Sequence, residues 1–236
     1  MSSTSRCAVI FDMDGVLVNS EPTYMAIERD LFRSVGAEIS PEEHDGFVGT
    51  PVAGLWKLVV SRATSPCTAE ELHEQSRARI RAWLAEPGPL EPMPGVIDLL
   101  DLLDAERIPF AVASSSSLHN IDAILRRLGI RERFAALVSG HEVPRGKPAP
   151  DVFLEAARRL GADPADCTVF EDAHFGVAGA KAAGMFCVGV RNPGSGNQDL
   201  SAADLVVDSL TEVLESGLLS RTPAGSRGCG EPAGRV

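Results

Sequence analysis

Two aspartates, Asp12 and Asp14, stand directly after the apolar run Cys7–Phe11. A short apolar run of this kind is typical of a buried central strand, and ligand sites form where such strands end. An ionised aspartate there needs a metal ion or another cation as its partner. An extended chain would send the two side chains to opposite faces, and Gly15 permits the turn that brings both to one ligand. Such pairs are also common at surfaces, so the buried strand before them is what favours a functional role.

Further polar residues follow later apolar runs or lie in loops. Ser114–Ser117 could offer hydroxyls and backbone N–H groups to an anion, or could simply cap the next helix. Glu171 and Asp172 end the run Cys167–Phe170, and adjacent carboxylates repel each other unless a cation lies nearby. Asp172 could equally cap a helix. Lys147 is one of three lysines beside nineteen arginines, and its compact charge suits a phosphoryl group.

Two familiar nucleotide-binding patterns are absent. The segment Gly140–Lys147 has one residue too many between its two glycines for a P-loop, and Pro148 stands where serine or threonine is required. Gly176, Gly179 and Gly184 do not match a dinucleotide-binding fingerprint. We interpret these glycines as small residues that allow close helix packing.

Strands and helices are expected to alternate through most of the chain. The predicted strands are Cys7–Asp12, Pro109–Ala113, Ala135–Ser139, Cys167–Phe170, Phe186–Val190 and Asp204–Val207. The predicted helices between them are Gly95–Glu106, Leu118–Leu128, Asp151–Leu160 and Ala173–Ala183, and a glycine follows each of the last three. This alternation predicts an α/β fold with a parallel sheet covered by helices on both faces.

The stretch 19–89 breaks the alternation because it shows helical periodicity without convincing strands. Helices are predicted over Glu21–Val35, from the cap Ser40, and from the capping box at Thr68 to about Leu84. Asn19 could cap the first of them. We therefore expect a core domain from 1–18 and 90–218, an inserted helical domain over 19–89, and a disordered tail over 219–236.

Composition excludes several classes of protein. The chain of 236 residues has a formal charge of −11, which disfavours nucleic acid and anionic membranes as partners. No apolar run is long enough to span a bilayer or to form a secretory leader, so we expect a cytoplasmic protein. The five cysteines lack metal-site or disulfide spacing and are expected to be reduced.

Taken together, the polar strand ends resemble the four motifs of the haloacid dehalogenase superfamily. The residues themselves are similar to those of its sugar-phosphatase and β-phosphoglucomutase-like subgroup in four segments: Phe11–Pro22, Ala113–Ser116, Gly146–Asp151 and Phe170–Ala173. The resemblance runs from about Arg6 to Leu218. It implies a Rossmann-like core with a four-helix cap in the inserted stretch.

The resemblance also implies a mechanism and a cofactor. Asp12 would attack phosphorus to form an aspartyl-phosphate, and Asp14 would act as general acid and base. Ser114 and Lys147 would hold the phosphoryl oxygens. Mg²⁺ would be bound by Asp12, by the carbonyl of Asp14, and by Asp172 with Glu171 nearby.

Differences from the motifs of other members of the superfamily reduce the number of reactions that this chain could catalyse. Dehalogenases of this fold lack the second carboxylate, which is present here as Asp14. Phosphonatases carry a lysine just after the turn Gly49–Val52, and Lys57 lies too far along. β-Phosphoglucomutases carry an arginine where Val52 stands, lysine and asparagine after the serine turn, and histidine in place of Tyr24. We therefore favour a phosphatase of monophosphorylated sugars or polyols over a mutase.

The substrate is expected to be a small phosphorylated molecule bound by a monomeric enzyme. The candidate substrate contacts come from the core and from the cap: Ser114, Ser115, Ser116, Ser117, Lys147, Glu21, Tyr24, Arg77 and Arg81. The two arginines could also be an ordinary solvated helix face. A non-catalytic sensor of phosphorylated metabolites is the remaining alternative, and the acid/base residue Asp14 argues against it.

Overall fold

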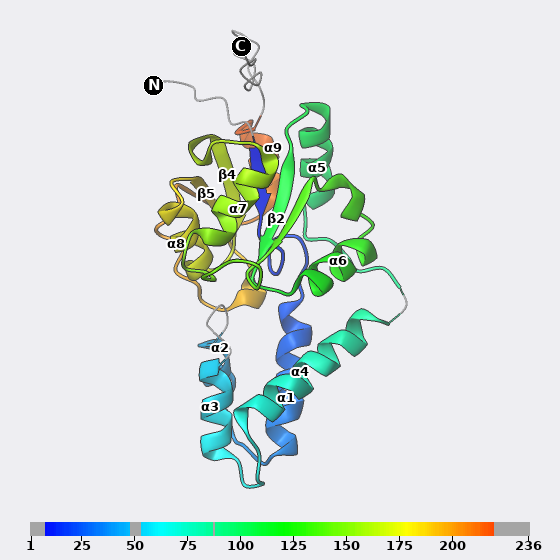
Figure 1. Cartoon of the computed structure of the whole chain (residues 1–236), viewed down its shortest axis with the longest axis vertical. Helices are drawn as coiled ribbons and strands as arrows, with labels where there is room; N and C mark the ends of the chain where they lie inside the picture. The colour runs from blue at the N-terminus through cyan, green and yellow to red at the C-terminus, as the bar shows by residue number, and fades with distance from the viewer. Residues whose placement is uncertain (1–7, 48–52, 87, 220–236) are drawn as a thin grey trace, which may run out of the picture.

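A parallel six-stranded sheet forms the centre of the computed structural model, which describes residues 8–47, 53–86 and 88–219 (Figure 1). The strand order is β3-β2-β1-β4-β5-β6, with β3 and β6 at the edges. The strands are β1 (Ala8–Phe11), β2 (Phe110–Ser114), β3 (Ala136–Ser139), β4 (Cys167–Glu171), β5 (Phe186–Val190) and β6 (Leu205–Val207). All six predicted strands are confirmed, and the parallel sheet confirms the predicted fold class.

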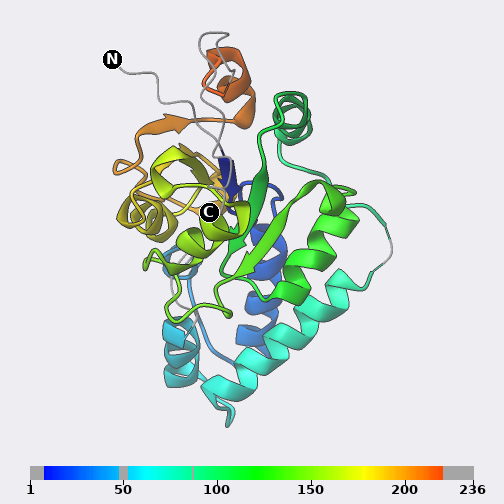
Figure 2. The same cartoon turned by 45° about the horizontal axis from the view of Figure 1, so that its top comes forward.

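Two layers of helices cover the sheet (Figure 2). One layer consists of α5 (Val96–Ala105), α6 (Leu118–Arg127) and α9 (Leu210–Ser216), and the other of α7 (Asp151–Leu160) and α8 (His174–Ala182). Alternate residues of β1 face the two layers, Val9 and Phe11 toward the first and Ala8 and Ile10 toward the second. A strand that is buried on both faces has to be apolar throughout, which explains the continuous apolar run before Asp12.

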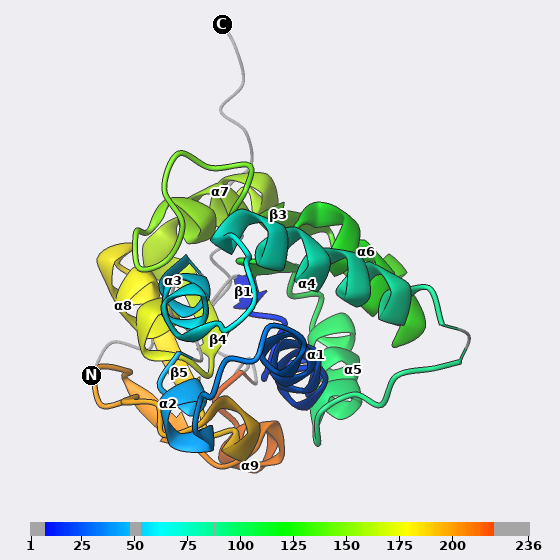
Figure 3. The ribbon, with the colours of Figure 1, turned by 90° about the horizontal axis from the view of Figure 1, so that it is seen from below.

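Four helices form a separate body between β1 and α5. They are α1 (Glu21–Ser34), α2 (Pro41–Asp45), α3 (Ala53–Arg62) and α4 (Ala69–Leu84). They bury a core of their own, built around Leu31, Phe32, Leu55, Trp56, Val59 and Leu72. Figure 1 shows this body below the sheet, and Figure 3 shows α1, α3 and α4 around the end of β1. The exact domain boundaries at residues 18 and 90 stay a prediction.

Two helices do not appear among those predicted from residue patterns. Helix α3 contains Gly54 and the β-branched pair Val59 and Val60, which weaken intrinsic helicity, and burial of Leu55 and Trp56 stabilises it instead. Helix α9 spans only seven residues after the last strand. Such a short segment gives too little periodicity to be recognised.

The predicted helix ends are largely confirmed. Ser40 and Thr68 each form a capping box with the glutamate three residues later. Gly129, Gly161 and Gly184 have positive φ angles just beyond the helices they end. The proposed cap at Asn19 is wrong, since the N-cap of α1 is the next residue along the chain.

Some sequence features lie outside the described residues. These are the segment 48–52, which includes most of the Gly49–Val52 turn, and residues 220–236 of the predicted tail. Among the residues that are described, no helix has the length and apolar character needed to cross a membrane. Cys167 and Cys187 are buried free thiols and Cys67 is partly buried and also free, as expected of reduced cysteines.

Candidate active site

A single ammonium group joins two carboxylates at the ends of the central strands β1 and β4. Nζ of Lys147 lies 2.5 Å from Oδ1 of Asp12 and 2.7 Å from Oε1 of Glu171. Burial would lower the pKa of Lys147, but the charges of Asp12 and Glu171 raise it above its usual value. Burial raises the pKa of Asp12 to about 8 despite the attraction of Lys147. The site therefore holds a buried carboxylate next to a fixed cation.

Asp14 lies on the turn after β1 and has different partners. The hydroxyl of Ser20 donates to Oδ1, and the hydroxyl of Ser116 donates to Oδ2 at 3.0 Å. The turn is closed by a 2.8 Å bond from the N–H of Gly15 to the carbonyl of Val18, and Gly15 has a φ of 86°. Burial raises the pKa of Asp14, and the two serine hydrogen bonds oppose the rise. A raised pKa suits a group that must give and take a proton.

Asp172 faces the loop that follows β5. The hydroxyl of Ser195 donates to its Oδ2, and the amide of Asn192 donates to that hydroxyl at 2.8 Å. The N-cap of α8 is Ala173, so the alternative that Asp172 caps this helix is wrong. A Cβ added to Gly15 would lie 1.8 Å from Oδ2 of Asp172. The first loop therefore passes directly beside this carboxylate, which brings Asp172 to the same edge as Asp12 and Asp14.

Helix α8 approaches Glu171 so closely that only glycine fits. A Cβ on Gly176 would lie 1.6 Å from Oε1 of Glu171, while Oε2 accepts a 2.9 Å bond from the N–H of Ala173. A Cβ on Gly179 would lie 3.1 Å from the ring of Phe153. The interpretation as packing residues is confirmed for Gly176 and Gly179, and at Gly176 the close neighbour is a carboxylate of the site. It is wrong for Gly184, where an added Cβ would meet nothing within 4 Å and the positive φ angle is what requires glycine.

The four serines after β2 have different surroundings. Ser114 accepts a 3.0 Å bond from the N–H of Ser116 through its hydroxyl, and the Ser116 hydroxyl binds Asp14. Ser117 is the N-cap of α6 and accepts from the N–H of Asn120. The side chain of Ser115 is exposed. The turn therefore supplies both a helix cap and groups that reach the site.

Two of the predicted cap contacts, Glu21 and Tyr24, are placed near Asp14. Burial raises the pKa of Glu21 to about 8, and the charge of Asp14 adds to the rise. The hydroxyl of Tyr24 is buried and lacks a well-formed hydrogen bond, and its ring packs edge-on against Trp83 at 5.9 Å. Burial raises the pKa of Tyr24, as does the neighbouring charge of Asp14. Both side chains carry polar atoms that a ligand could use.

The two predicted arginine contacts are not brought to the carboxylates. Arg81 pairs with Glu74 at 2.7 Å, and Arg77 lies 3.7 Å from the same glutamate. Their side chains are 43% and 51% exposed, which is typical of a solvated helix face. A role for them in binding stays a prediction.

The charge balance of the site favours a bound cation. Four carboxylates share the edge with the ammonium of Lys147. Asp12, Glu171 and Asp172 are buried, and Asp14 is partly buried. Burial and repulsion from Glu171 and Asp12 raise the pKa of Asp172 well above its usual value. Hard oxygen donors fit Mg²⁺, which keeps several of its waters and needs few protein ligands. Among the described residues, no group of three or more His, Cys, Asp or Glu side chains is arranged to hold a metal ion by itself, so an ion here would need main-chain carbonyl or water ligands as well.

Hydroxyl partners of the carboxylates were not predicted. Ser20 lies within a recognised motif, but nothing in its spacing marks it as a partner of Asp14. Ser195 lies in a loop rich in glycine and asparagine, with no periodic pattern around it. For Ser20, the one available signal was the resemblance of the segment Phe11–Pro22, which identifies the stretch but not the contact. For Ser195, no motif segment gave a signal.

Comparison with known proteins gives a family for the chain. The model of the family described as "Hydrolase: haloacid dehalogenase-like hydrolase" matches residues 8–184. Hexitol phosphatase B of Escherichia coli is 34% identical, with 90% of this chain and 96% of that protein covered. β-Phosphoglucomutase of Bacillus subtilis is also 34% identical, with 87% and 91% covered.

A solved structure agrees with these relatives. CbbY from Rhodobacter sphaeroides, in complex with xylulose-(1,5)bisphosphate, superposes with a TM-score of 0.74 at 28% sequence identity. The match covers 87% of this chain and 95% of CbbY. The fold is thus that of a known group of proteins.

We expect Gly176→Ala to abolish most of the activity of the enzyme. The added methyl would overlap the Glu171 carboxylate, and displacing it would also displace Lys147; a shift of about 1 Å costs roughly 100-fold in rate. The measurement is kcat/KM together with the melting temperature. Gly54→Ala is the matched control, because its methyl meets only the outer edge of the Phe47 ring at 3.3 Å. Wild-type activity in Gly176→Ala would contradict the close approach of α8.

Proposed function

The chain belongs to the haloacid dehalogenase-like hydrolases, and we propose that it is a Mg²⁺-dependent phosphatase of small sugar or polyol monophosphates. The observation that carries this proposal is the arrangement of Asp12 and Asp14. The carboxylate of Asp12 is bonded to Lys147, and that of Asp14 accepts hydrogen bonds from the hydroxyls of Ser20 and Ser116. Two aspartates in such different surroundings suit two different tasks.

Asp12 is proposed as the nucleophile. Its ionised carboxylate attacks phosphorus, and the ester oxygen leaves with a proton from Asp14. The resulting aspartyl-phosphate is hydrolysed by water, from which Asp14 takes a proton. Ser114 and Lys147 are assigned to the phosphoryl oxygens, and the bond of Lys147 to the nucleophile Asp12 supports this assignment.

The metal would be held by the carboxylates of Asp12 and Asp172 and by the main-chain carbonyl of Asp14. Glu171 would lie nearby, bonded to Lys147. When bound, Mg²⁺ offsets the negative charge that a phosphate ester brings to an acidic site. The protein itself orients these ligands, since Ser195 holds Asp172 and Lys147 holds Asp12.

The leaving group is proposed to be rich in hydroxyl groups. The carboxylate of Glu21 can accept hydrogen bonds from a polyol, and the Tyr24 hydroxyl is buried without a well-formed bond of its own. Above a pH of about 8, where Glu21 is ionised, a second phosphate at this place would be repelled by the Glu21 carboxylate. This favours monophosphates over the bisphosphates that a mutase has to bind.

The mutase remains the second candidate because the two relatives are equally identical to the chain. The site residues argue against it. Ser117 is used as a helix cap and Leu118 follows it, so this turn offers no cation to a distant phosphate. A coupled assay with glucose 1-phosphate and a bisphosphate activator separates the two activities.

Phosphatase activity is tested with a panel of esters: a hexitol phosphate, glucose 6-phosphate, glycerol 3-phosphate and p-nitrophenyl phosphate. We expect Mg²⁺-dependent release of phosphate from at least one alkyl ester and loss of that release on chelation. Asp12→Asn keeps the size of the side chain and should lose activity by at least about 1,000-fold, since no covalent intermediate can form. Phosphate release by this variant at the wild-type rate would exclude Asp12 as the nucleophile.

Glu21→Gln tests the choice of leaving group. At about pH 9, above the pKa of about 8 that burial gives Glu21, the variant removes one negative charge beside the site, so we expect the preference for a hexitol monophosphate over a hexose bisphosphate to fall about tenfold. The ratio of the two kcat/KM values is the measurement. Glu70→Gln, on an exposed cap position, is the matched control and should keep the wild-type ratio. An unchanged ratio in Glu21→Gln would remove Glu21 from the binding site.

A further inference from the structure

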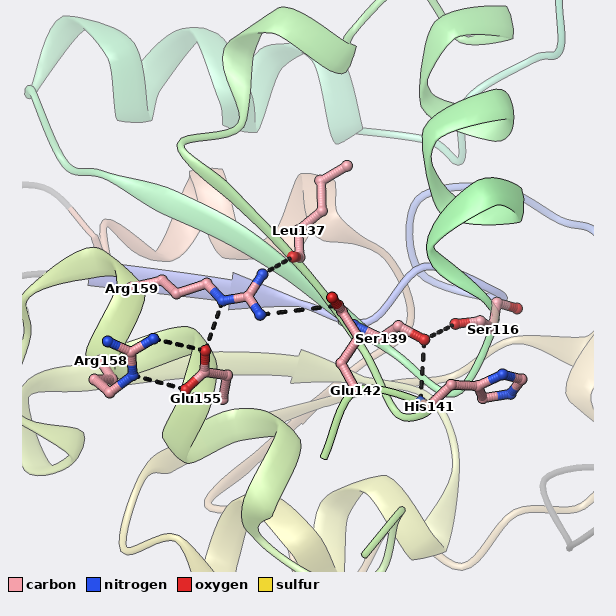
Figure 4. Close-up of polar contacts among 8 residues, drawn as sticks. All are labelled: Ser116, Leu137, Ser139, His141, Glu142, Glu155, Arg158 and Arg159. Atoms are coloured by element: carbon pink, nitrogen blue, oxygen red, sulfur yellow. Dashed lines mark hydrogen bonds and ion pairs between the residues drawn. The ribbon is translucent and has the colours of Figure 1, made fainter. Parts of the chain in front are cut away.

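Ser139 is a fully buried serine at the end of β3 that no motif accounts for. Its hydroxyl donates to the carbonyl of Ser116 at 2.7 Å and accepts from the N–H of His141 at 3.1 Å (Figure 4). The N–H of Gly140 donates to the carbonyl of Ser114 at 2.7 Å. The end of β3 is therefore bonded to the serine turn at two points.

The edge position of β3 explains why its end needs side-chain support. An edge strand has no neighbour for one row of its backbone groups. Here the carbonyl of Leu137 accepts a 2.7 Å bond from Arg159, and the N–H of Ser139 donates to Glu142 at 3.2 Å. Arg159 also lies 3.8 Å from Glu142 and donates to Glu155 at 2.7 Å (Figure 4). Side chains of α7 and of the loop after β3 thus fix the strand that carries Ser139.

The turn that Ser139 contacts is the one that reaches Asp14. Ser116 receives the Ser139 bond on its main-chain carbonyl and uses its hydroxyl to bind Asp14. Within the serine turn, the N–H of Ser116 also donates to Ser114. Three hydrogen bonds therefore hold Ser116, to Ser114, Asp14 and Ser139. Of these three partners, Ser139 is the one outside the serine turn and the carboxylate cluster.

We propose that Ser139 is a positioning residue for the acid/base step, holding Ser116 so that Asp14 is aimed at the leaving oxygen. The inference rests on the proposed function, because it assigns Asp14 the role of proton donor. Loss of the Ser139 hydroxyl would leave the nucleophile and Lys147 in place and would loosen the contact between Ser116 and Asp14.

The test compares two leaving groups in Ser139→Ala. An alkyl alcohol needs a proton to leave, whereas p-nitrophenolate leaves without one. We expect kcat/KM for the best alkyl ester of the panel to fall about tenfold, and that for p-nitrophenyl phosphate to change less than about twofold, because general acid catalysis is worth roughly 100-fold or more. A purely structural defect would lower both values alike, and that result would overturn the proposal.

A double-mutant cycle with Ser116→Ala locates the effect. If Ser139 acts through Ser116, adding Ser139→Ala to Ser116→Ala should lower kcat/KM for the alkyl ester by less than about twofold. Multiplication of the two single effects would overturn the proposal. Ser216→Ala is the matched control, because the Ser216 hydroxyl also donates to a main-chain carbonyl, that of Val213, and accepts from a main-chain N–H, that of Leu218.

A second variant covers the case in which Ser139→Ala does not fold. Arg159→Met removes the bond to the Leu137 carbonyl from a side chain that is 30% exposed, and should give the same selective loss in smaller measure. Equal losses for both esters would overturn the proposal. A wild-type enzyme that hydrolyses no monoester would instead overturn the proposed phosphatase function, and the inference about Ser139 with it.

Discussion

The bond that Lys147 makes to both Asp12 and Glu171 is the constraint on which the rest of the site depends. The two carboxylates end strands that pair in register, with Phe11 beside Phe170, so their charges are forced together by the sheet itself. Without a cation between them, neighbouring buried carboxylates would repel or take up protons. The rings of Phe11 and Phe170 stack at 5.2 Å just before the carboxylates, and the Phe153 ring lies 5.0 Å from the lysine ammonium. The packed rings below the site therefore fix where the carboxylates and the ammonium group lie.

The same contact explains how an acidic chain can handle phosphate. A formal charge of −11 opposes the approach of any anion, and at this edge the carboxylates outnumber the ammonium group that contacts them. Lys147 compensates for Asp12 and Glu171 only in part, which leaves Asp14 and Asp172 held by hydroxyl groups rather than by cations. A phosphate dianion can enter only if more positive charge accompanies it. This is the physical reason for assigning a divalent metal to the site.

The sequence predicted the strands and the residues at their ends because buried parallel strands are uniformly apolar and end in the groups that bind ligands. It did not predict the serines that hold those groups, since a single serine such as Ser20, Ser139 or Ser195 gives no periodic signal. The error at Asn19 has a related cause. Asparagine and serine are both good caps, and only the folded chain shows that Ser20 occupies the N-cap while its hydroxyl is already used by Asp14.

The position of Ser20 also couples the cap to the catalytic edge. Ser20 immediately precedes α1, so a rotation of that helix against the sheet would change the bond between Ser20 and Asp14. Asp172 is supported next to the same segment: a Cβ on Gly194 would lie 2.7 Å from Oδ1 of Asn19, and the adjacent Ser195 holds Asp172. The residues that support Asp14 and Asp172 thus lie in, or directly against, the segment that leads from β1 into α1. Asp12, in contrast, is bonded to Lys147, whose ammonium lies over the Phe153 ring of α7.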